Sequence, residues 1–369
     1  MKILLVGEYS GLHSNLKKGL LKHGCKVDMI SYGDSWKKLD DGCLMNSRAL
    51  YPLSVLFDEL NLKMLEFANK CDKYDVVQFI NPLVTNTRLQ IALRTLNINR
   101  IIIEKLIEKS KKSFLLAAGD DHYYFKAVES GHFRYNPLDD SEYYDLPRRK
   151  RWYSQYWKND ILRKWNIRLV EMVDGIIPCL YEYDVGYELE KIKNKRKCIP
   201  FPFSLDSIEF YPNRIINKPN IIHVETRSGF KGTHHVKEAF KKIEGRNDIS
   251  CELLTRMPFK IFKEKMATAN IVIDQLNSYS YAYTAINALA AGKIVISGFE
   301  DEIIEKYKFT GCPALVNTKP NPEDLIEKIN ALCRNSNKFI EWGRSGREYV
   351  EKVHDAEKIA FLYLEEWSA

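Results

Sequence analysis

Short apolar runs alternate with longer amphipathic stretches along the chain of 369 residues. Runs such as 3–6 and 294–296 consist of Ile, Leu and Val and have the length of a strand, so we predict buried strands there. After the first run, Leu16, Leu20 and Leu21 recur at helical spacing and predict an amphipathic helix. Strands that alternate with helices in this way indicate an α/β protein built on parallel sheets.

The clearest unit of this kind begins with a β-branched run at 271–273, which predicts a buried strand. A polar and aromatic loop, 275–282, leads into an Ala-rich helix, 283–291, which Gly292 ends before the strand 294–296. Ligands of parallel sheets bind beyond the carboxyl ends of the strands. The loop lies at such an end, and the helix behind it points backbone N–H groups there, so we predict an anion site.

Two further polar loops follow predicted strands in the first half of the chain. The turn at 7–11 comes after the predicted strand 1–6 and belongs to a strand–helix–strand start that is typical of a Rossmann-like domain. Its glycines do not have the GxGxxG spacing, so we predict no dinucleotide cofactor. The loop after the strand 113–118 contains Asp121 and His122. Each loop is either a plain surface turn or part of a ligand site.

The 270–298 unit resembles the donor-site segment of retaining glycosyltransferases of family 4, which have the GT-B fold. In that family two glutamates usually flank a glycine, and the matching positions here hold Tyr279, Asn287 and Ala282. The helix end Ala-Leu-Ala-Ala-Gly, 288–292, keeps the family's frame. The chain is more similar to a divergent bacterial subgroup with a "DQL-x-S-Y" loop and without the two acids. The resemblance implies two Rossmann-like domains whose parallel sheets face a central cleft.

The resemblance also implies a division of the chain. An extended stretch with two prolines around Phe201 marks the connection between the domains. We therefore predict an N-terminal acceptor domain at 1–199, a linker at 200–204, a nucleotide-sugar domain at 205–345, and a segment at 346–369 whose helix crosses back to the N-terminal domain.

Family members move a sugar from a nucleotide-diphosphate donor to an acceptor, and the loops of this chain carry matching residue types. The residues predicted for the donor diphosphate are Arg227, Lys231, Gly232, Ser280, Tyr281 and Thr284. Those predicted for the ribose or sugar are Tyr279 and Asn287, and Asp121 and His122 are the predicted catalytic residues. The predicted acceptor loop consists of Gly7, Glu8, Tyr9 and Ser10.

The chemistry of this transfer explains why Arg227 and Lys231 occur together in one loop, here called the basic loop. Cleavage of a sugar–diphosphate bond places negative charge on the leaving oxygen, which two fixed cations and helix N–H groups can stabilise without a metal. The chain contains no Asp-x-Asp motif, so we predict no metal and no cofactor. We expect a glycan or lipid-linked acceptor and a role in bacterial surface polysaccharide or glycoconjugate synthesis.

Composition adds a possible membrane contact. The net charge is +7, and aromatic residues alternate with arginines and lysines over 123–168, including the run 148–151. This stretch suits a lipid-diphosphate acceptor or an anionic bilayer surface, but it is equally typical of a solvated excursion. Nucleic acid is not an expected partner, because no nucleic-acid-binding module accompanies it.

The eight cysteines are scattered, and neither a signal peptide nor an apolar run of membrane-spanning length occurs. We therefore expect reduced thiols in the cytoplasm, and the basic stretch is compatible with a peripheral position at the inner face of the membrane. Two alternatives to transfer stay open. One is a nucleotide-sugar-binding protein that has lost catalysis with its acids. The other is an epimerase-like enzyme that rearranges a nucleotide sugar.

Overall fold

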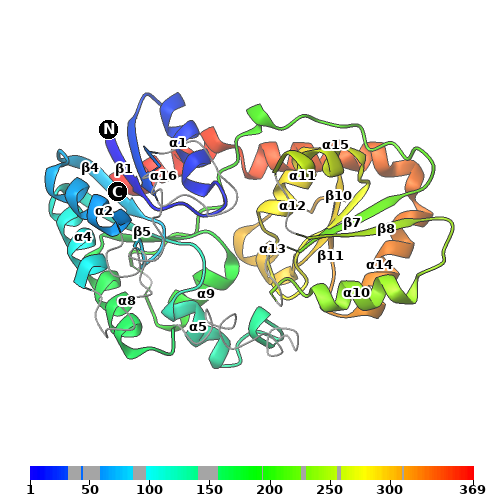
Figure 1. The fold of residues 1–369 in the computed structure, drawn as a ribbon, viewed down its shortest axis with the longest axis horizontal. Helices are drawn as coiled ribbons and strands as arrows, with labels where there is room; N and C mark the ends of the chain where they lie inside the picture. The colour runs from blue at the N-terminus through cyan, green and yellow to red at the C-terminus, as the bar shows by residue number, and fades with distance from the viewer. Residues whose placement is uncertain are drawn as a thin grey trace. The chain divides into compact units, whose positions relative to one another are not determined.

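A computed structural model of the chain contains two compact α/β units (Figure 1). It describes residues 1–31, 43–44, 59–85, 97–139, 157–192, 194–225, 230–255, 259–309 and 311–369. The first unit comprises Met1–Ser130, Tyr153–Pro202 and Ala356–Ala369. The second unit comprises Gly131–Trp152 and Phe203–Asp355. No helix within the described ranges is long and apolar enough to cross a bilayer.

The first unit is a parallel sheet with helices around it. Its strands are β1 (Lys2–Val6), β2 (Lys26–Ser31), β3 (Cys43–Leu44), β4 (Tyr74–Phe79), β5 (Ser110–Ala117) and β6 (Gly175–Pro178), in the spatial order β3-β2-β1-β4-β5-β6. Its helices are α1 (Leu12–Lys22), α2 (Glu59–Lys70), α4 (Asn97–Glu108), α5 (His122–Glu129), α8 (Asp160–Met172), α9 (Tyr181–Leu189) and α16 (Ala356–Ser368). The order reverses at β1, where a doubly wound sheet opens its ligand crevice.

The last helix, α16, packs on α1 in this unit (Figure 1). Tyr363 and Trp367 of α16 are fully buried, as are Leu16 and Leu20 of α1. Large aromatic side chains contribute much of the apolar area that a helix removes from water. The first unit therefore depends on two helices from distant parts of the sequence.

The second unit repeats the pattern with five parallel strands. These are β7 (Asn220–Val224), β8 (Ser250–Leu254), β9 (Ile271–Ile273), β10 (Ile294–Ser297) and β11 (Leu315–Asn317), in the order β11-β10-β9-β7-β8. Its helices are α10 (Thr233–Lys242), α11 (Phe259–Thr268), α12 (Tyr283–Ala290), α13 (Asp301–Tyr307), α14 (Pro322–Arg334) and α15 (Phe339–Val353). Isoleucines of the three central strands form the core: Ile221, Ile271, Ile273, Ile294 and Ile296.

The α/β class and the two Rossmann-like parallel sheets are confirmed. The predicted strands at 271–273 and 294–296 are β9 and the first three residues of β10. The structure assigns Gly131–Trp152 to the second unit, together with Phe203–Asp355. Sequence alone did not indicate this, since the packing partners of residues 133–135 lie far along the chain.

Candidate functional site

The loops after β7 and β9 meet in a buried ion pair at the carboxyl edge of the second sheet. Lys231 Nζ donates to Asp274 Oδ1 at 2.6 Å and to Thr284 Oγ1 at 3.2 Å. The other carboxylate oxygen of Asp274 accepts from the backbone N–H of Ala282 at 3.3 Å. Asp274 is fully buried, so its charge requires these partners. The ammonium group of Lys231 is therefore fixed beside the start of α12.

Gly232 brings the basic loop against the loop after β9. Its φ of 72° is in the left-handed region, and a Cβ there would lie 2.8 Å from Asn277 Oδ1. The backbone N–H of Leu276 also donates to Lys231 O at 3.0 Å. A side chain at position 232 would force the two loops apart.

The helices α10 and α12 both begin at this place. Their N-cap residues, Gly232 and Ala282, have no side-chain hydrogen-bonding group, and the carboxylate that bonds to the N–H of Ala282 is that of Asp274, the partner of Lys231. The first N–H groups of a helix lack partners within the helix and carry partial positive charge. Together with Lys231 they form a site suited to a phosphate.

The loop 275–282 is held rigidly. Gln275 Nε2 donates to Ser280 O at 2.6 Å, and Ser297 Oγ donates to Gln275 O at 3.2 Å. Position 298 accepts only glycine, because a Cβ there would lie 1.8 Å from the carbonyl oxygen of Ser278. The loop is thus preorganised rather than formed around a ligand.

Two predicted residues of the donor loop have different surroundings. The Tyr281 hydroxyl is buried and bonds to Tyr349 Oη at 2.8 Å and to His354 Nε2 at 2.7 Å. Its side chain therefore anchors the loop in the interior of the second unit. Asn287 is partly exposed, and its amide nitrogen donates to Tyr283 O at 2.8 Å within α12.

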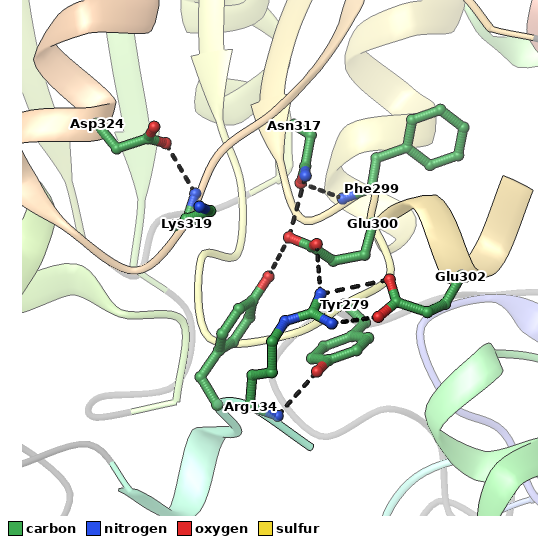
Figure 2. Close-up of polar contacts among 9 residues, drawn as sticks. Arg134, Tyr279, Phe299, Glu300, Glu302, Asn317, Lys319 and Asp324 are labelled. Carbon is green, nitrogen blue, oxygen red and sulfur yellow. Dashed lines mark hydrogen bonds and ion pairs between the residues drawn. The ribbon is translucent and has the colours of Figure 1, made fainter. Parts of the chain in front are cut away.

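Tyr279 takes part in a cluster that the sequence did not reveal (Figure 2). Its hydroxyl accepts from the backbone N–H of Arg134 at 2.8 Å, and the Arg134 guanidinium lies 4.8 Å from the centre of its ring. Arg134 also forms ion pairs with Glu300, at 2.6 Å, and with both carboxylate oxygens of Glu302. The Glu302 hydrogen bond to Arg134 lowers the pKa of that carboxyl group.

Glu300 is the centre of this cluster. It accepts hydrogen bonds from the Tyr135 hydroxyl at 2.5 Å and from Asn317 Nδ2 at 3.0 Å, in addition to its ion pair with Arg134 (Figure 2). Burial, followed by the Glu300 hydrogen bond, raises the pKa of Tyr135. Asn317 is itself oriented by the Phe299 N–H, which donates to its Oδ1 at 2.8 Å. The turn after β10 is thereby fixed to the end of β11.

In the first unit, Glu8 of the predicted acceptor loop is buried. Its carboxylate accepts from the Ser14 N–H at 2.8 Å, the Ser14 hydroxyl at 2.6 Å and the His13 N–H at 3.3 Å. It therefore occupies the first turn of α1. Tyr9 is 38% exposed, and Ser10 has a φ of 57°, which is uncommon for a residue with a side chain. The exposed part of this loop is Tyr9, and Ser10 is partly exposed.

The two predicted catalytic residues also differ from each other. Asp121 is 1% exposed and caps α5, where its carboxylate accepts from the Tyr124 N–H at 2.8 Å and from the Tyr187 hydroxyl. Burial raises its pKa to about 6. His122 lines a cavity of about 520 Å³ together with Lys126 and Arg163. Burial, followed by these two cations, lowers the pKa of His122.

Some predicted residues lie outside the described ranges. They are Arg227 in the loop after β7 and the basic run 148–151. The residues that sequence reasoning missed are Asp274, Arg134 and Glu300. Asp274 and Glu300 carried a local signal, since Asp274 directly follows the strand β9 and Glu300 lies in the acidic turn after the strand β10, both at the predicted ligand edge.

Comparison with known proteins gives the architecture a precedent. No protein-family model and no curated protein sequence matches the chain. Among solved structures, HepE from Anabaena in complex with UDP-glucose is 14% identical, with 100% of this chain and 99% of that chain covered and a TM-score of 0.61. A sucrose-phosphate synthase from Thermosynechococcus elongatus is 13% identical, with 100% and 98% covered and a TM-score of 0.58.

A glycosyltransferase from Rickettsia africae is 16% identical, with 99% of this chain and 97% of that chain covered and a TM-score of 0.54. At such low identity these likenesses show the fold alone. The two Rossmann-like domains are those of the GT-B fold, as predicted.

Proposed function

We propose that the protein is a glycosyltransferase that binds a nucleotide-diphosphate sugar on its second unit and transfers the sugar to a glycan or lipid-linked acceptor. The observation that carries this proposal is the fixed Lys231 beside the N-termini of α10 and α12. The fold adds support, because structures with this fold include complexes with UDP and UDP-glucose.

The arrangement suits the departure of a nucleoside diphosphate. Negative charge that develops on the leaving phosphate oxygen would be met by the ammonium group of Lys231 and by helix N–H groups that need no reorganisation. Asp274 balances part of the lysine's charge but fixes its position. Arg227, in the same loop, would supply the second cation. Loss of one such donor in other enzymes costs roughly 3 kcal/mol of transition-state stabilisation.

The acceptor is proposed to bind at the carboxyl edge of the first sheet. His122 is favoured over Asp121 for direct contact with a substrate, because His122 lines a cavity and the Asp121 carboxylate is buried in its cap. In the loop after β1, Tyr9 is exposed and Ser10 is partly exposed. Retention at the anomeric carbon, membership of family 4 and a role in surface polysaccharide synthesis rest on the resemblance of the 275–292 segment.

One observation favours a second candidate, a nucleotide-sugar-binding protein without turnover. The family's two glutamate positions hold Tyr279 and Asn287, and Tyr279 is 3% exposed beneath Arg134. No carboxylate is therefore supplied from these two positions. Sugar transfer would therefore have to rely on Lys231 and the helix N-termini to stabilise the charge on the leaving phosphate.

A thermal-shift screen against UDP, GDP, CMP and dTDP and their sugars, with and without EDTA, tests the donor site. A ligand at 100 times its dissociation constant adds about 2.7 kcal/mol to the free energy of unfolding, which raises the melting temperature by roughly 5–10 °C. We expect such a shift with one nucleoside diphosphate, unchanged by EDTA. The absence of a shift with every ligand would overturn the donor site.

Product analysis then separates transfer from binding alone. The nucleotide sugar that shifts the melting temperature is incubated with the protein and a panel of glycan and lipid-linked acceptors. We expect release of the nucleoside diphosphate together with a glycosylated acceptor. Binding with no product from any acceptor would favour the second candidate, and an altered sugar formed without acceptor would indicate the epimerase-like activity.

A further inference from the structure

A segment from the first half of the chain packs on the donor loop of the second unit. Residues 132–139, here called the strap, follow α5 along the chain but belong to the second unit. Three consecutive strap side chains surround the ring of Tyr279. The ring centres of Phe133 and Tyr135 lie 5.5 and 5.1 Å from it, and the Arg134 guanidinium lies 4.8 Å away.

Arg134 joins two loops that follow neighbouring strands. Its backbone N–H holds the Tyr279 hydroxyl of the loop after β9, and its guanidinium holds Glu300 and Glu302 of the turn after β10 (Figure 2). The two loops are also tied directly, because the Glu300 N–H donates to Tyr279 O at 3.2 Å. Arg134 therefore fixes the loops through both its backbone and its side chain.

The charges make Arg134 the principal partner of this turn. Glu300 is 7% exposed, and the other side chains that contact its carboxylate, Tyr135 and Asn317, are neutral. A buried carboxylate without a cation is costly, and two neighbouring carboxylates repel each other. The Arg134 side chain itself is 53% exposed. The cation therefore stabilises the turn while remaining at the edge where a ligand would bind.

The cluster lies within reach of the phosphate site. Ala282, whose N–H bonds to Asp274, follows Tyr279 by three residues, and three residues span at most about 11 Å. A diphosphate placed at Lys231 and at the starts of α10 and α12 carries its sugar directly on the second phosphate. One end of the donor therefore extends to the neighbourhood of Tyr279 and Glu300.

We propose that Arg134 is a positioning residue of the donor site, which holds the loop 275–282 against the turn 299–302 so that the sugar end of the donor is received in one orientation. This inference rests on the proposed function. Arg134 acts through Tyr279 and Glu300 and contacts neither the phosphates nor the reacting atoms. Its loss should weaken recognition of the sugar and leave recognition of the nucleoside diphosphate intact.

The test compares Arg134→Gln with a conservative variant and a matched control. Arg134→Lys keeps a cation over Tyr279 but cannot form the forked pair with Glu302. Arg246→Gln is the control, because Arg246 forms a similar forked pair with Asp248 just before β8, at the opposite edge of the same sheet. Tyr135→Phe removes one hydrogen bond from Glu300 and provides a milder variant if Arg134→Gln does not fold.

Calorimetry with UDP, GDP and dTDP and with their glucose conjugates first identifies the nucleoside diphosphate and the nucleotide sugar that bind the wild type. The affinities of the variants are then measured with these two ligands. For Arg134→Gln we expect the nucleoside diphosphate to bind within about twofold of wild type and the nucleotide sugar to bind at least tenfold more weakly. Arg134→Lys should recover part of that loss, and Arg246→Gln should change neither affinity. Tyr135→Phe should weaken nucleotide-sugar binding by a smaller factor.

Three results overturn the inference in distinguishable ways. If the wild type binds no nucleotide, the proposed function fails and the inference fails with it. If the wild type binds and Arg134→Gln matches it with both ligands, the inference alone fails. If Arg134→Gln weakens both ligands equally, Arg134 stabilises the fold without positioning the sugar.

Discussion

In the first unit, carboxylates occupy the first turns of the helices that follow β1 and β5. In the second unit, the helices that follow β7 and β9 have N-cap residues without a side-chain hydrogen-bonding group, and Asp274 bonds to the N-cap N–H of α12. Glu8 accepts N–H groups of α1, and Asp121 accepts one of α5. Gly232 and Ala282 offer no such group. The acids at the helix starts of the first unit thus accept N–H groups directly, whereas the acid at the start of α12 is paired with Lys231, the cation that the proposed anionic ligand would meet.

The buried ion pairs of the two units provide the largest expected effect. Lys231→Met leaves Asp274 unpaired in the interior, so we expect the free energy of unfolding to fall by about 3–5 kcal/mol. Arg196→Met should cost a similar amount, because Arg196 pairs with the buried Asp184 in the first unit. Urea unfolding measures both losses.

The comparison predicts that only one of these pairs matters for the donor. A double variant, Lys231→Met with Asp274→Asn, should regain most of the stability and still fail to bind a nucleoside diphosphate in calorimetry. Arg196→Met should bind it normally. Equal loss of binding in both would show that the second unit's pair has no special role.

Burial keeps one histidine of each unit, His13 and His223, neutral, and acid should destabilise both units through these residues. Burial lowers the pKa values of His13 and His223 to about 4 from 6.5. Because the unfolded chain takes up these protons first, stability is complete above pH 6.5 and falls as the pH decreases toward 4. Each histidine accounts for up to about 3 kcal/mol of this loss.

In the first unit, Asp121 opposes this trend. Its folded-state pKa is raised from 3.8 to about 6, so its protonation stabilises the fold as the pH falls through that range. Urea unfolding between pH 4.5 and 7.5 should show a weaker pH dependence in His13→Gln and in His223→Gln than in wild type. An unchanged pH profile in either variant would contradict the neutral state of that histidine.

A carboxylate introduced at the start of α12 would make the second unit resemble the first. Ala282→Asp should cap the helix with its own charge and reduce the affinity for a nucleoside diphosphate by about 100-fold, comparable to the loss of one strong anion-binding donor. Ala282→Asn is the matched control, since it can cap without charge and should reduce affinity less. Calorimetry measures both, and equal affinities for Ala282→Asp and wild type would refute the helix-start site.

The reverse change in the first unit should have the smallest effect. Glu8→Ala removes the acceptor for the first turn of α1 and should cost about 1–2 kcal/mol of stability, as the loss of a helix cap does. The affinity of the second unit for a nucleoside diphosphate should stay the same. Thermal unfolding and calorimetry check the two statements, and a gain of nucleotide binding by the first unit would show that the comparison is too simple.

Periodicity predicted the fold well because the relevant information is local. The isoleucine and valine runs of β9 and β10 are buried on both sides, and such strands read as continuous apolar runs. Lys231 was also identifiable, since it stands in a basic loop between a strand and a helix. In these cases neighbours in the sequence determine the structure.

The strap and the buried acids show where local information ends. Arg134 pairs with Glu300 and Glu302, which follow it in the sequence by 166 and 168 residues. This pairing depends on which unit the strap joins. Sequence reasoning therefore treated the strap as part of a basic and aromatic patch. Asp121 is the N-cap residue of α5 and accepts from the N–H of Tyr124, three residues later. An Asp just before a predicted helix is a recognisable capping signal, and it competed with the catalytic interpretation.

The packing of α16 on α1 has a consequence for synthesis on the ribosome. The first unit contains the start of the chain, yet its α1 is covered by a helix translated after nearly all of the second unit. At about 5–20 residues per second, α1 waits roughly 15–70 s for its partner. During that interval the face of α1 with Gly19 and His23 lacks its final cover, so the nascent first unit should be a substrate for chaperones while the second unit is already folding.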